Sequence, residues 1–324
     1  MSALEIDDVV VEFATDSGPV RALDGASLTV RPGSSVAIVG ESGSGKSTLA
    51  SLIGRLQPGN AQVVRGGVRV DGRDVAALDT RALRELRRTM LGSVPQDPIE
   101  SLDPTLRIGR QLQLVLRLAG KDSSVVARRA LLDGVRIDDP DRVLRLHPHE
   151  VSGGMAQRVA IAVAMCRSPR ILVADEPTAA LDAQVREDVI RLMFEQARAT
   201  GTTIVWLSHD LPTVARWCDE VAVMYAGRIV EHGPAAEVLG SPVHPYTRAL
   251  AAADPTRVRQ GERLVSIGGG PPVLHAEAPG CAFAPRCAFA DDACSVSRPV
   301  PALLRGRVHL CLRAEALEAV EVRS

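Results

Sequence analysis

The sequence predicts an α/β protein in which short buried strands alternate with helices. An apolar run at 35–39 is followed by a glycine-rich loop and then by leucine and isoleucine residues at helical spacing up to 56. Two later apolar runs, at 171–174 and 202–208, have the length and composition of buried parallel strands. From 108 to about 166 the pattern is mainly helical, which predicts a helical insertion in the α/β domain.

The composition excludes several classes of protein. Hydrophobic residues make up 46% and charged residues 24% of the 324 residues, which is typical of a globular protein with an ample core. The net charge of −1 leaves no basic footprint for DNA or RNA, so no nucleic-acid partner is expected. No apolar run approaches about 18 residues, and no secretory signal opens the chain. We therefore expect a cytoplasmic protein whose cysteines stay reduced.

Outside the three buried runs, shorter segments complete the predicted elements. Valine-rich and alternating patterns predict strands at 4–13 and 26–30. Another strand runs into a turn at 66–74, and a short apolar strand is expected at 91–94. The polar, arginine-rich segment 80–88 between them is expected to form a solvated helix.

The glycine-rich loop from Gly40 to Thr48 fits the phosphate-binding pattern G-x-x-x-x-G-K-[ST]. Its glycines permit a tight turn and a close approach of phosphate to the backbone. Lys46 can reach the β- and γ-phosphates, and the Ser47 hydroxyl can ligate Mg²⁺. The alternative is a chance glycine-rich turn, but a strand and a helix flank the loop, and the only other lysine is Lys121. The sequence therefore predicts a nucleoside triphosphate site formed by Gly40, Ser42, Gly43, Gly45, Lys46, Ser47 and Thr48.

Two later strands end in polar residues that suit the same chemistry. Asp175 closes the run 171–174 and can hold Mg²⁺, while Glu176 can polarise an attacking water. His209 follows the run 202–208, at the carboxyl end where ligands bind in open α/β sheets. An ordinary acidic turn and a structural histidine are the alternatives. The preceding phosphate loop favours the functional interpretation of the carboxylates.

Taken in order, these elements resemble the nucleotide-binding subunits of ABC transporters. The most specific part is Ser152-Gly153-Gly154 followed by Gln157-Arg158, which resembles the family's signature sequence. The resemblance implies a P-loop ABC-type ATPase core with an antiparallel β subdomain and an inserted helical subdomain at about 97–168. It also implies that the signature caps the ATP of a second ATPase subunit, either a paralogue or a second copy of this chain, in a head-to-tail dimer. A serine and two glycine N–H groups at a helix start suit such an anion site.

The resemblance assigns roles to further residues. Gln96 is similar to the glutamine that contacts Mg²⁺ and senses the γ-phosphate, and Asp182 to the aspartate of the D-loop. His209 resembles the switch histidine. Phe13 stands where the family has an aromatic residue that stacks on adenine, although a core position is the alternative. The catalytic set implied is Glu176, His209 and Gln96, with Ser47, Gln96 and Asp175 around Mg²⁺.

Within the family, the chain resembles the ATPases of oligopeptide, dipeptide and nickel importers. The segment 96–98 running into 101–104 is similar to that group's extended Q-loop, and 241–247 resembles the His-Pro-Tyr motif of its C-terminal extension. The resemblance implies an ATPase domain at 1–250 and an extension at 251–324. It also implies two membrane permease subunits, a separate solute-binding protein and a peripheral location on the cytoplasmic face of the membrane. The solute remains open.

Two other functions compete with import. A non-transport ABC ATPase acting on DNA or ribosomes would carry either a long coiled coil between the ATPase halves or two P-loops, and the sequence has neither. A small P-loop kinase would not need the signature at 152–154. An importer ATPase is therefore the leading hypothesis.

Four of the six cysteines, at 281, 287, 294 and 311, form a cluster in the extension. Their spacing lacks the C-x₂₋₄-C pairs with which zinc sites usually begin. Four thiolates in a reduced compartment can instead hold an iron–sulfur cluster. Some relatives in the peptide-importer group carry this cysteine tail with a [4Fe–4S] cluster, so the resemblance favours that cofactor for Cys281, Cys287, Cys294 and Cys311, with zinc or four ordinary thiols as alternatives. Cys166 and Cys218 are expected to be core residues.

Overall fold

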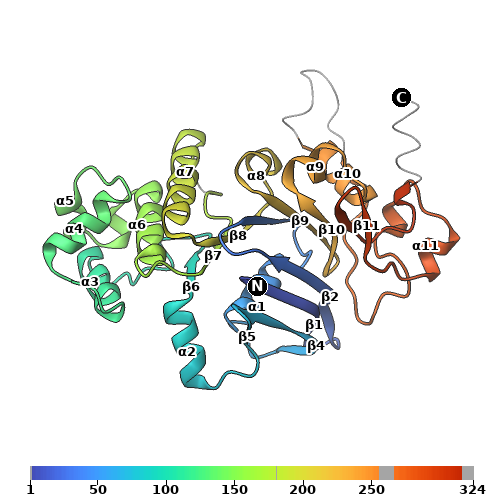
Figure 1. Cartoon of the computed structure of the whole chain (residues 1–324), viewed down its shortest axis with the longest axis horizontal. Coiled ribbons are helices and arrows are strands. Elements are labelled where there is room, and N and C mark those ends of the chain that lie inside the picture. The colour runs from blue at the N-terminus through green and yellow to red at the C-terminus, as the bar shows by residue number, and fades with distance from the viewer. Residues whose placement is uncertain (1, 180, 255–265, 316–324) are drawn as a thin grey trace. The chain divides into compact units, whose positions relative to one another are not determined.

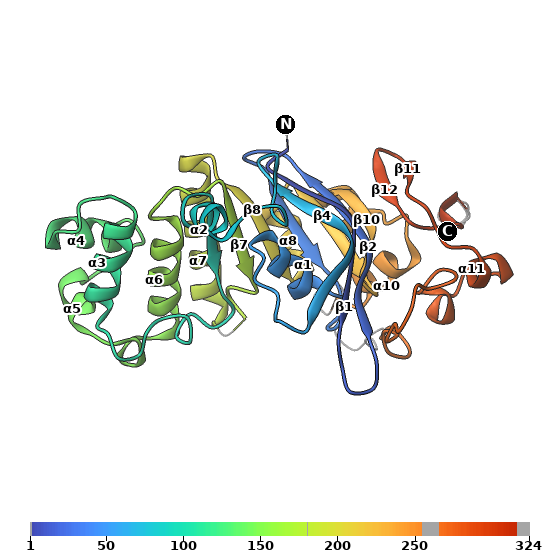
Figure 2. The same ribbon diagram turned by 90° about the horizontal axis from the view of Figure 1, so that it is seen from below.

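A computed structural model describes residues 2–179, 181–254 and 266–315, and the chain divides into two compact units. The first unit comprises Met1–Val30, Ser35–Ala77 and Leu207–Ser324, and the second comprises Arg31–Ser34 and Leu78–Trp206. Most helices and strands of both units are labelled in Figures 1 and 2. The C-terminal residues thus belong to the same unit as the predicted phosphate loop.

The first unit contains a four-stranded antiparallel sheet with the order β2-β1-β4-β5. Its strands are β1 (Leu4–Phe13), β2 (Val20–Val30), β4 (Ala61–Val70) and β5 (Arg73–Asp74). Apolar side chains of β1 and β2 alternate into the core, and Leu4, Val9 and Leu23 are completely buried. This sheet is the antiparallel β subdomain that the resemblance implied.

The strands of the second sheet that lie in the first unit follow the order β11-β12-β10-β9-β3. They are β3 (Ser35–Val39), β9 (Glu220–Tyr225), β10 (Arg228–Pro234), β11 (Ala302–Leu304) and β12 (Arg307–His309). Strands β3 and β9 pair in parallel, whereas β9 with β10, β10 with β12, and β12 with β11 pair antiparallel. The helices of this unit are α1 (Lys46–Ile53), α8 (Leu211–Trp217), α9 (Ala235–Gly240), α10 (Pro245–Ala252) and α11 (Asp292–Val296), with a 3₁₀ turn η3 (Ala284–Arg286).

The second unit combines three strands with the helical insertion. The strands are β6 (Leu91–Val94), β7 (Ile171–Asp175) and β8 (Thr203–Ser208), whose last two residues belong to the first unit. The helices are α2 (Thr80–Thr89), α3 (Ile108–Leu118), α4 (Val125–Asp133), α5 (Pro140–Arg145), α6 (Gly153–Met165) and α7 (Ala183–Thr200), with a 3₁₀ turn η1 (Pro148–Glu150).

Local sequence signals explain where these helices begin. Ser124, Asp139, Ser152 and Asp182 each accept a hydrogen bond from a backbone N–H of the first turn that follows. Helices α3, α4 and α5 lie together, and α6 contacts both α4 and α7 (Figure 2). Phe194 of α7 packs edge-on against Trp206 of β8, with ring centroids 5.9 Å apart. Within the helical insertion, Leu112, Leu116, Leu132 and Val143 of α3, α4 and α5 are buried, so the insertion has an apolar core.

Most predicted elements are confirmed. The strands at 4–13, 35–39 and 91–94 have the predicted bounds, whereas the strand predicted at 26–30 already begins at Val20. The helix at 80–89 is not solvated all round, because Leu83 and Leu86 are buried. Among the described residues, no helix is both long and apolar enough to cross a bilayer.

Candidate nucleotide site

The loop between β3 and α1 is shaped by two glycines that no other residue could replace. Gly40 and Gly45 have φ values of +156° and +105°. A Cβ on Gly40 would lie 2.2 Å from the Met224 carbonyl oxygen, and one on Gly45 would lie 2.7 Å from that of Ala22. The loop therefore packs its backbone directly against β2 and β9.

Lys46, the first residue of α1, folds its side chain back into this loop. Its Nζ donates to the carbonyl oxygens of Gly40, at 2.8 Å, and Glu41, at 3.0 Å, and the residue is 9% exposed. No side chain caps α1, because its N-cap residue is Gly45. A helix start without a side-chain cap suits an anion as the acceptor for its first N–H groups.

The loop also contains a polar atom that the sequence analysis missed. The Ser44 side chain is 1% exposed, and its Oγ has no hydrogen-bond partner in the part of the chain that the structure describes. Leaving a buried hydroxyl unsatisfied costs about 1–3 kcal/mol, so such a group calls for an explanation. A phosphate oxygen in the loop would supply the missing partner. Ser42 and Ser47 are exposed at the same loop.

In the second unit, the parallel pairing of β6 and β7 brings Gln96 and the two carboxylates to one sheet edge. Val94, the last residue of β6, pairs with Ala174, so Gln96 lies just beyond the end of β6 and Asp175 is the last residue of the adjacent β7. Asp175 and Glu176 are half-buried and Gln96 is exposed. Glu176 has a φ of +41°, a conformation that strains any residue with a Cβ. Strain of this kind clusters at functional sites.

The remaining nucleotide-site candidates lie in the first unit. His209 is exposed directly after β8, where the next residue, Asp210, caps α8 by accepting from the Thr213 N–H at 3.1 Å. Phe13 is the last residue of β1 and is half-buried. It is therefore not fully enclosed in the core, and its stacking role stays a prediction. The structure groups the predicted residues in two sets, one within each unit.

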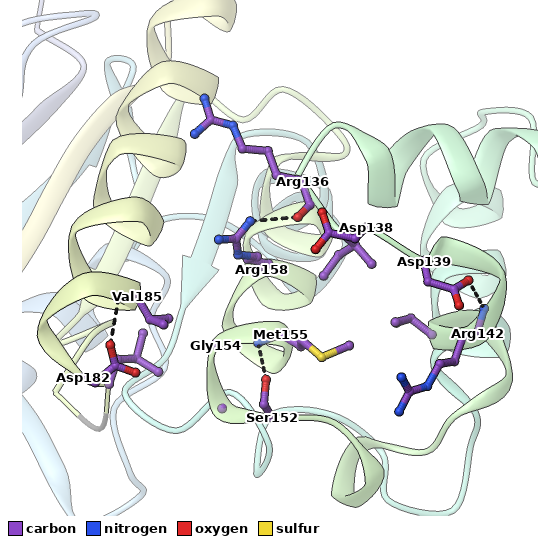
Figure 3. Close-up of a pocket in the computed structure, with 14 residues that line it drawn as sticks. Arg136, Asp138, Asp139, Arg142, Ser152, Gly154, Met155, Arg158, Asp182 and Val185 are labelled. Atoms are coloured by element: carbon purple, nitrogen blue, oxygen red, sulfur yellow. Dashed lines mark hydrogen bonds between the residues drawn. The ribbon is translucent and has the colours of Figure 1, made fainter.

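The signature residues border a groove of about 660 Å³ in the second unit (Figure 3). Ser152 caps α6 with its Oγ, which accepts from the Met155 N–H at 3.3 Å, and Asp182 caps α7 in the same way through Val185 at 3.0 Å. Ser152 and Gly153 are exposed. A Cβ on Gly154 would lie 2.6 Å from the Val185 Cγ1, so this glycine lets α6 approach α7 closely. An exposed helix start thus faces the groove.

The four clustered cysteines line a single small cavity of about 10 Å³ in the first unit, together with His244 and Phe283. Burial raises the pKa of the thiols of Cys281 and Cys287, and it raises that of Cys311 to about 12. In the segments that the structure describes, no group of three or more His, Cys, Asp and Glu side chains is arranged to hold a metal ion. The structure therefore does not support the predicted metal site as it stands. Cys166 and Cys218 are buried, as predicted.

Comparisons with known proteins identify the family. Residues 23–179 match the ABC transporter family, and residues 230–294 match the oligopeptide/dipeptide transporter C-terminal region. The chain is 40% identical over 313 residues to the oligopeptide transport ATP-binding protein OppD of Salmonella typhimurium, covering 96% of this chain and 93% of that protein. It is 39% identical over 313 residues to OppD of Escherichia coli. The chain is an ABC transporter ATP-binding subunit of the oligopeptide/dipeptide group.

Solved structures agree with this assignment. A dimeric ATP-binding cassette in a post-hydrolysis state with ADP and Pi superposes with a TM-score of 0.63 at 29% identity, covering 72% of this chain and 98% of that chain. The protein cbiO1 of Clostridium perfringens, part of an ABC transporter complex, gives a TM-score of 0.63 at 26% identity, covering 74% and 91%. This ABC subunit is thus an ATP hydrolase coupled to transmembrane transport. It belongs neither to the P-loop kinases nor to the ABC ATPases that act on DNA or ribosomes.

Proposed function

We propose that this ABC subunit drives the import of peptides through two membrane permease subunits, on the cytoplasmic face of the membrane and with a separate solute-binding protein. Membership of the oligopeptide/dipeptide group supports peptides rather than nickel as the solute, because the OppD relatives are named for oligopeptide transport. The division into an ATPase domain at 1–250 and an extension at 251–324 stays a prediction.

ATP would bind at the loop 40–48, with its phosphates against the N-terminus of α1 and the Lys46 ammonium. The observation that carries this assignment is the buried Ser44 hydroxyl without a partner beside Lys46. Gly40, Ser42, Gly43, Gly45 and Thr48 would complete the cradle, and Phe13 would stack on the adenine. Ser47, Gln96 and Asp175 would hold Mg²⁺, which neutralises charge on the β- and γ-phosphates.

Hydrolysis would require a general base and a sensor for the γ-phosphate. Glu176 would polarise the attacking water, and Gln96 and His209 would contact the γ-phosphate. The strained backbone of Glu176 supports a position imposed by function, because φ > 0 is costly for glutamate. Each of these roles is a single-residue hypothesis that kinetics can test.

The second ATPase subunit would complete each site from outside. The exposed start of α6, with Ser152, Gly153 and Gly154 at the groove of Figure 3, supports a signature that binds the γ-phosphate held by the other subunit. Asp182 borders the same groove and would contact the partner. The dimeric cassette among the similar structures supports a dimer of ATPase subunits.

Complementation between two inactive variants tests the composite site. Lys46→Ala removes the phosphate contact and Ser152→Arg blocks the signature, so each variant alone is expected to be inactive. A mixture should recover hydrolysis, because a mixed dimer joins the intact loop of one chain to the intact signature of the other. If hydrolysis per subunit is independent of concentration and survives Ser152→Arg, each chain works alone and the proposal is wrong.

We further propose that Cys281, Cys287, Cys294 and Cys311 hold a [4Fe–4S] cluster with a structural role. The donor set supports this, since four thiols surround one cavity although the chain has only six cysteines. A cavity of about 10 Å³ is the size of one water, so the side chains must rotate outwards to admit the cluster. When bound, the cluster would ionise the four thiols and cross-link the segment.

Metal analysis of anaerobically purified protein decides whether these cysteines hold an iron–sulfur cluster, a zinc ion or no metal. We expect a brown protein with about four irons per chain and broad absorption near about 400 nm, as thiolate-to-iron charge transfer gives. Cys294→Ser should lower the iron content. Colourless protein with one zinc per chain, or with no metal, would refute the cluster.

A further inference from the structure

Glu41, the second residue of the phosphate loop, is held at both its backbone and its side chain by residues from the C-terminal part of the chain. Its N–H donates to the Tyr246 hydroxyl at 2.9 Å. Its two carboxylate oxygens accept from the two terminal nitrogens of Arg286, at 2.8 and 3.0 Å. This paired geometry is the strongest form of an arginine–carboxylate interaction. The phosphate loop is therefore joined to the extension at one residue.

Arg286 is itself fixed in position. Its Nε donates to the Gly268 carbonyl at 2.7 Å, and its terminal nitrogens also donate to Ile267 and to the Tyr225 hydroxyl. The guanidinium lies 5.7 Å from the centre of the Tyr225 ring, and its side chain is only 7% exposed. The hydrogen bonds that Arg286 donates to Glu41 raise the pKa of Arg286, so the group stays charged.

The surrounding aromatic cluster is unusual for this chain. Tyr225, Tyr246 and Phe283 pack with ring centroids 4.5 to 5.4 Å apart. The chain has only two tyrosines and four phenylalanines, and both tyrosines are used here. Rigid aromatic packing around a charged group fixes its geometry more firmly than a surface ion pair could.

A carboxylate within a phosphate-binding loop needs such a partner. ATP carries several negative charges, and an unpaired Glu41 would repel them at short range. Without its partner, the Glu41 side chain would also be free to turn towards the nucleotide. The start of the phosphate loop would then lose the side-chain contact that holds it. The ion pair with Arg286 neutralises the Glu41 carboxylate. The hydrogen bond from the Glu41 N–H to the Tyr246 hydroxyl fixes the backbone of the loop at this residue.

We infer that Arg286 is a positioning residue for ATP binding, which neutralises Glu41 and holds the first turn of the phosphate loop in its binding geometry. Tyr246 supports the same turn through its hydroxyl. The C-terminal extension is on this account part of the nucleotide site. The inference rests on the proposed role of the loop 40–48 in binding ATP.

Equilibrium binding of ATP to the purified full-length chain tests this inference. We expect Arg286→Ala to raise the Kd for ATP about tenfold, and Arg286→Lys to raise it less, because lysine keeps the charge but not the paired geometry. The decisive variant is Glu41→Gln in the Arg286→Ala background. It removes the unpaired carboxylate and should return the Kd to within about threefold of wild type, a recovery that a merely structural role of Arg286 would not produce.

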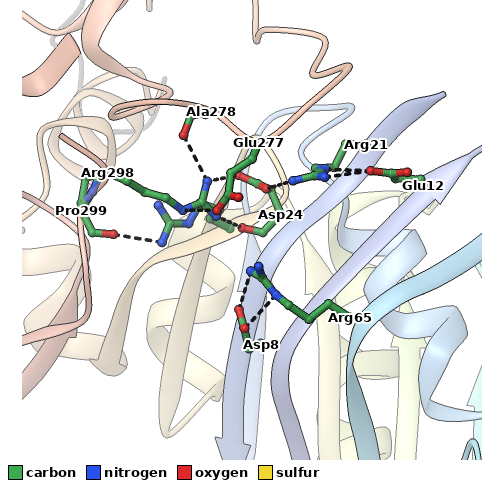
Figure 4. Close-up of polar contacts among 10 residues, drawn as sticks. Asp8, Glu12, Arg21, Asp24, Arg65, Glu277, Ala278, Arg298 and Pro299 are labelled. Atoms are coloured by element: carbon green, nitrogen blue, oxygen red, sulfur yellow. Dashed lines mark hydrogen bonds and ion pairs between the residues drawn. The ribbon is translucent and has the colours of Figure 1, made fainter. Parts of the chain in front are cut away.

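Arg298→Ala is the matched control. Arg298 also belongs to the extension and forms a 2.7 Å ion pair with the completely buried Asp24 of β2. Among the described residues, the hydrogen bonds of its side chain go to Asp24 and Ala278 rather than to the phosphate loop (Figure 4). This variant should lower the Tm and leave the Kd for ATP near the wild-type value. Lys46→Ala in the same assay separates the two hypotheses, because unchanged binding there would refute the phosphate loop itself.

Two results would overturn the inference while the phosphate loop stands. One is a Kd for Arg286→Ala within twofold of wild type, with Lys46→Ala strongly impaired. The other is a double variant that binds ATP as weakly as Arg286→Ala alone. If Arg286→Ala fails to fold, Arg286→Gln takes its place, alone and combined with Glu41→Gln, and the same two results overturn the inference.

Discussion

The conformation of Glu176 joins local strain to chemistry. Its φ of +41° costs a non-glycine residue about 1–3 kcal/mol, and such strain persists only where the surroundings impose it. The residue directly follows Asp175 at the end of β7, so the turn sets a carboxylate beside the candidate Mg²⁺ ligand. A glutamine has the same shape but cannot accept a proton from water.

Glu176→Gln should therefore reduce steady-state ATP hydrolysis at least about 100-fold, the range lost with a general base, while ATP binding is retained. Phosphate release and equilibrium ATP binding measure the two effects. Glu85→Gln, which alters an exposed carboxylate of α2 in the same unit, is the control and should hydrolyse normally. Turnover of Glu176→Gln within a few-fold of wild type would remove it from the catalytic set.

The two lysines of the chain make a natural pair of variants. Lys46 is buried in the phosphate loop, whereas Lys121 is exposed after α3. Lys46→Ala should weaken ATP binding at least about tenfold, because a charge-assisted contact to the phosphates is lost. Lys121→Ala should bind ATP as wild type does. Equal affinities of the two variants, measured with a labelled ATP analogue, would contradict the assignment of the loop.

At the scale of elements, the start of α6 depends on one close helix contact. Gly154 faces Val185 of α7 so closely that even a methyl group would lie 2.6 Å from the Val185 Cγ1. Gly154→Ala must push α6 away from α7, and overpacking of this kind costs about 1–3 kcal/mol. The shift would also move Ser152 at the exposed helix start.

Gly154→Ala should therefore lower both the Tm and the rate of hydrolysis, and Val185→Ala in the same chain should restore much of both by making room. Thermal unfolding and phosphate release provide the readouts. A double variant that is no better than Gly154→Ala would show that the tight contact is not the reason for the glycine.

How well the elements could be predicted depended on the sequence separation of their contacts. The strand 35–39, its loop and helix α1 are adjacent in sequence, so periodicity and glycine placement were sufficient. The contacts of Glu41 with Tyr246 and Arg286 span 205 and 245 residues, and no local sequence pattern predicts them. The same holds for Ser44, because only the three-dimensional structure shows that its hydroxyl is buried without a hydrogen-bond partner. The cysteines were grouped by spacing alone, and their common cavity required the fold.

At the scale of the first unit as a whole, the extension is joined to the ATPase core by strand pairing and by ion pairs. Strand β12 pairs with β10 through Glu231 and His232, and Arg298 binds Asp24 of β2 (Figure 4). Arg21 binds the same aspartate from β2 itself at 2.9 Å. Although burial opposes ionisation, hydrogen bonds from Arg298 and Arg21 hold the pKa of Asp24 below its usual value. The extension thus supplies a charge partner to a buried carboxylate of the core.

A second buried charge of the core depends on the extension even more strongly. Glu231 of β10 is completely buried and accepts from the N–H groups of Val243 and His244 at 3.0 and 2.9 Å. Among the described residues, the cation within ion-pair distance of Glu231 is Arg307 of β12, 3.7 Å away and 1% exposed. Arg307 also donates to the carbonyl oxygens of Glu237 and Ser241. Removing Arg307 leaves Glu231 buried and uncompensated, which typically costs about 3–5 kcal/mol.

Arg307→Ala should accordingly lower the free energy of unfolding by about 3–5 kcal/mol, and a chain ending at residue 254 should be less stable still, because it also loses β12 and the contacts of Arg286. Denaturant unfolding and ATP binding measure both. Arg313→Ala, which removes an exposed ion pair with Asp291 at 3.2 Å, is the control and should cost at most about 1 kcal/mol. A chain of residues 1–254 that unfolds like the full-length protein and binds ATP equally well would show that the ATPase core is independent of the extension.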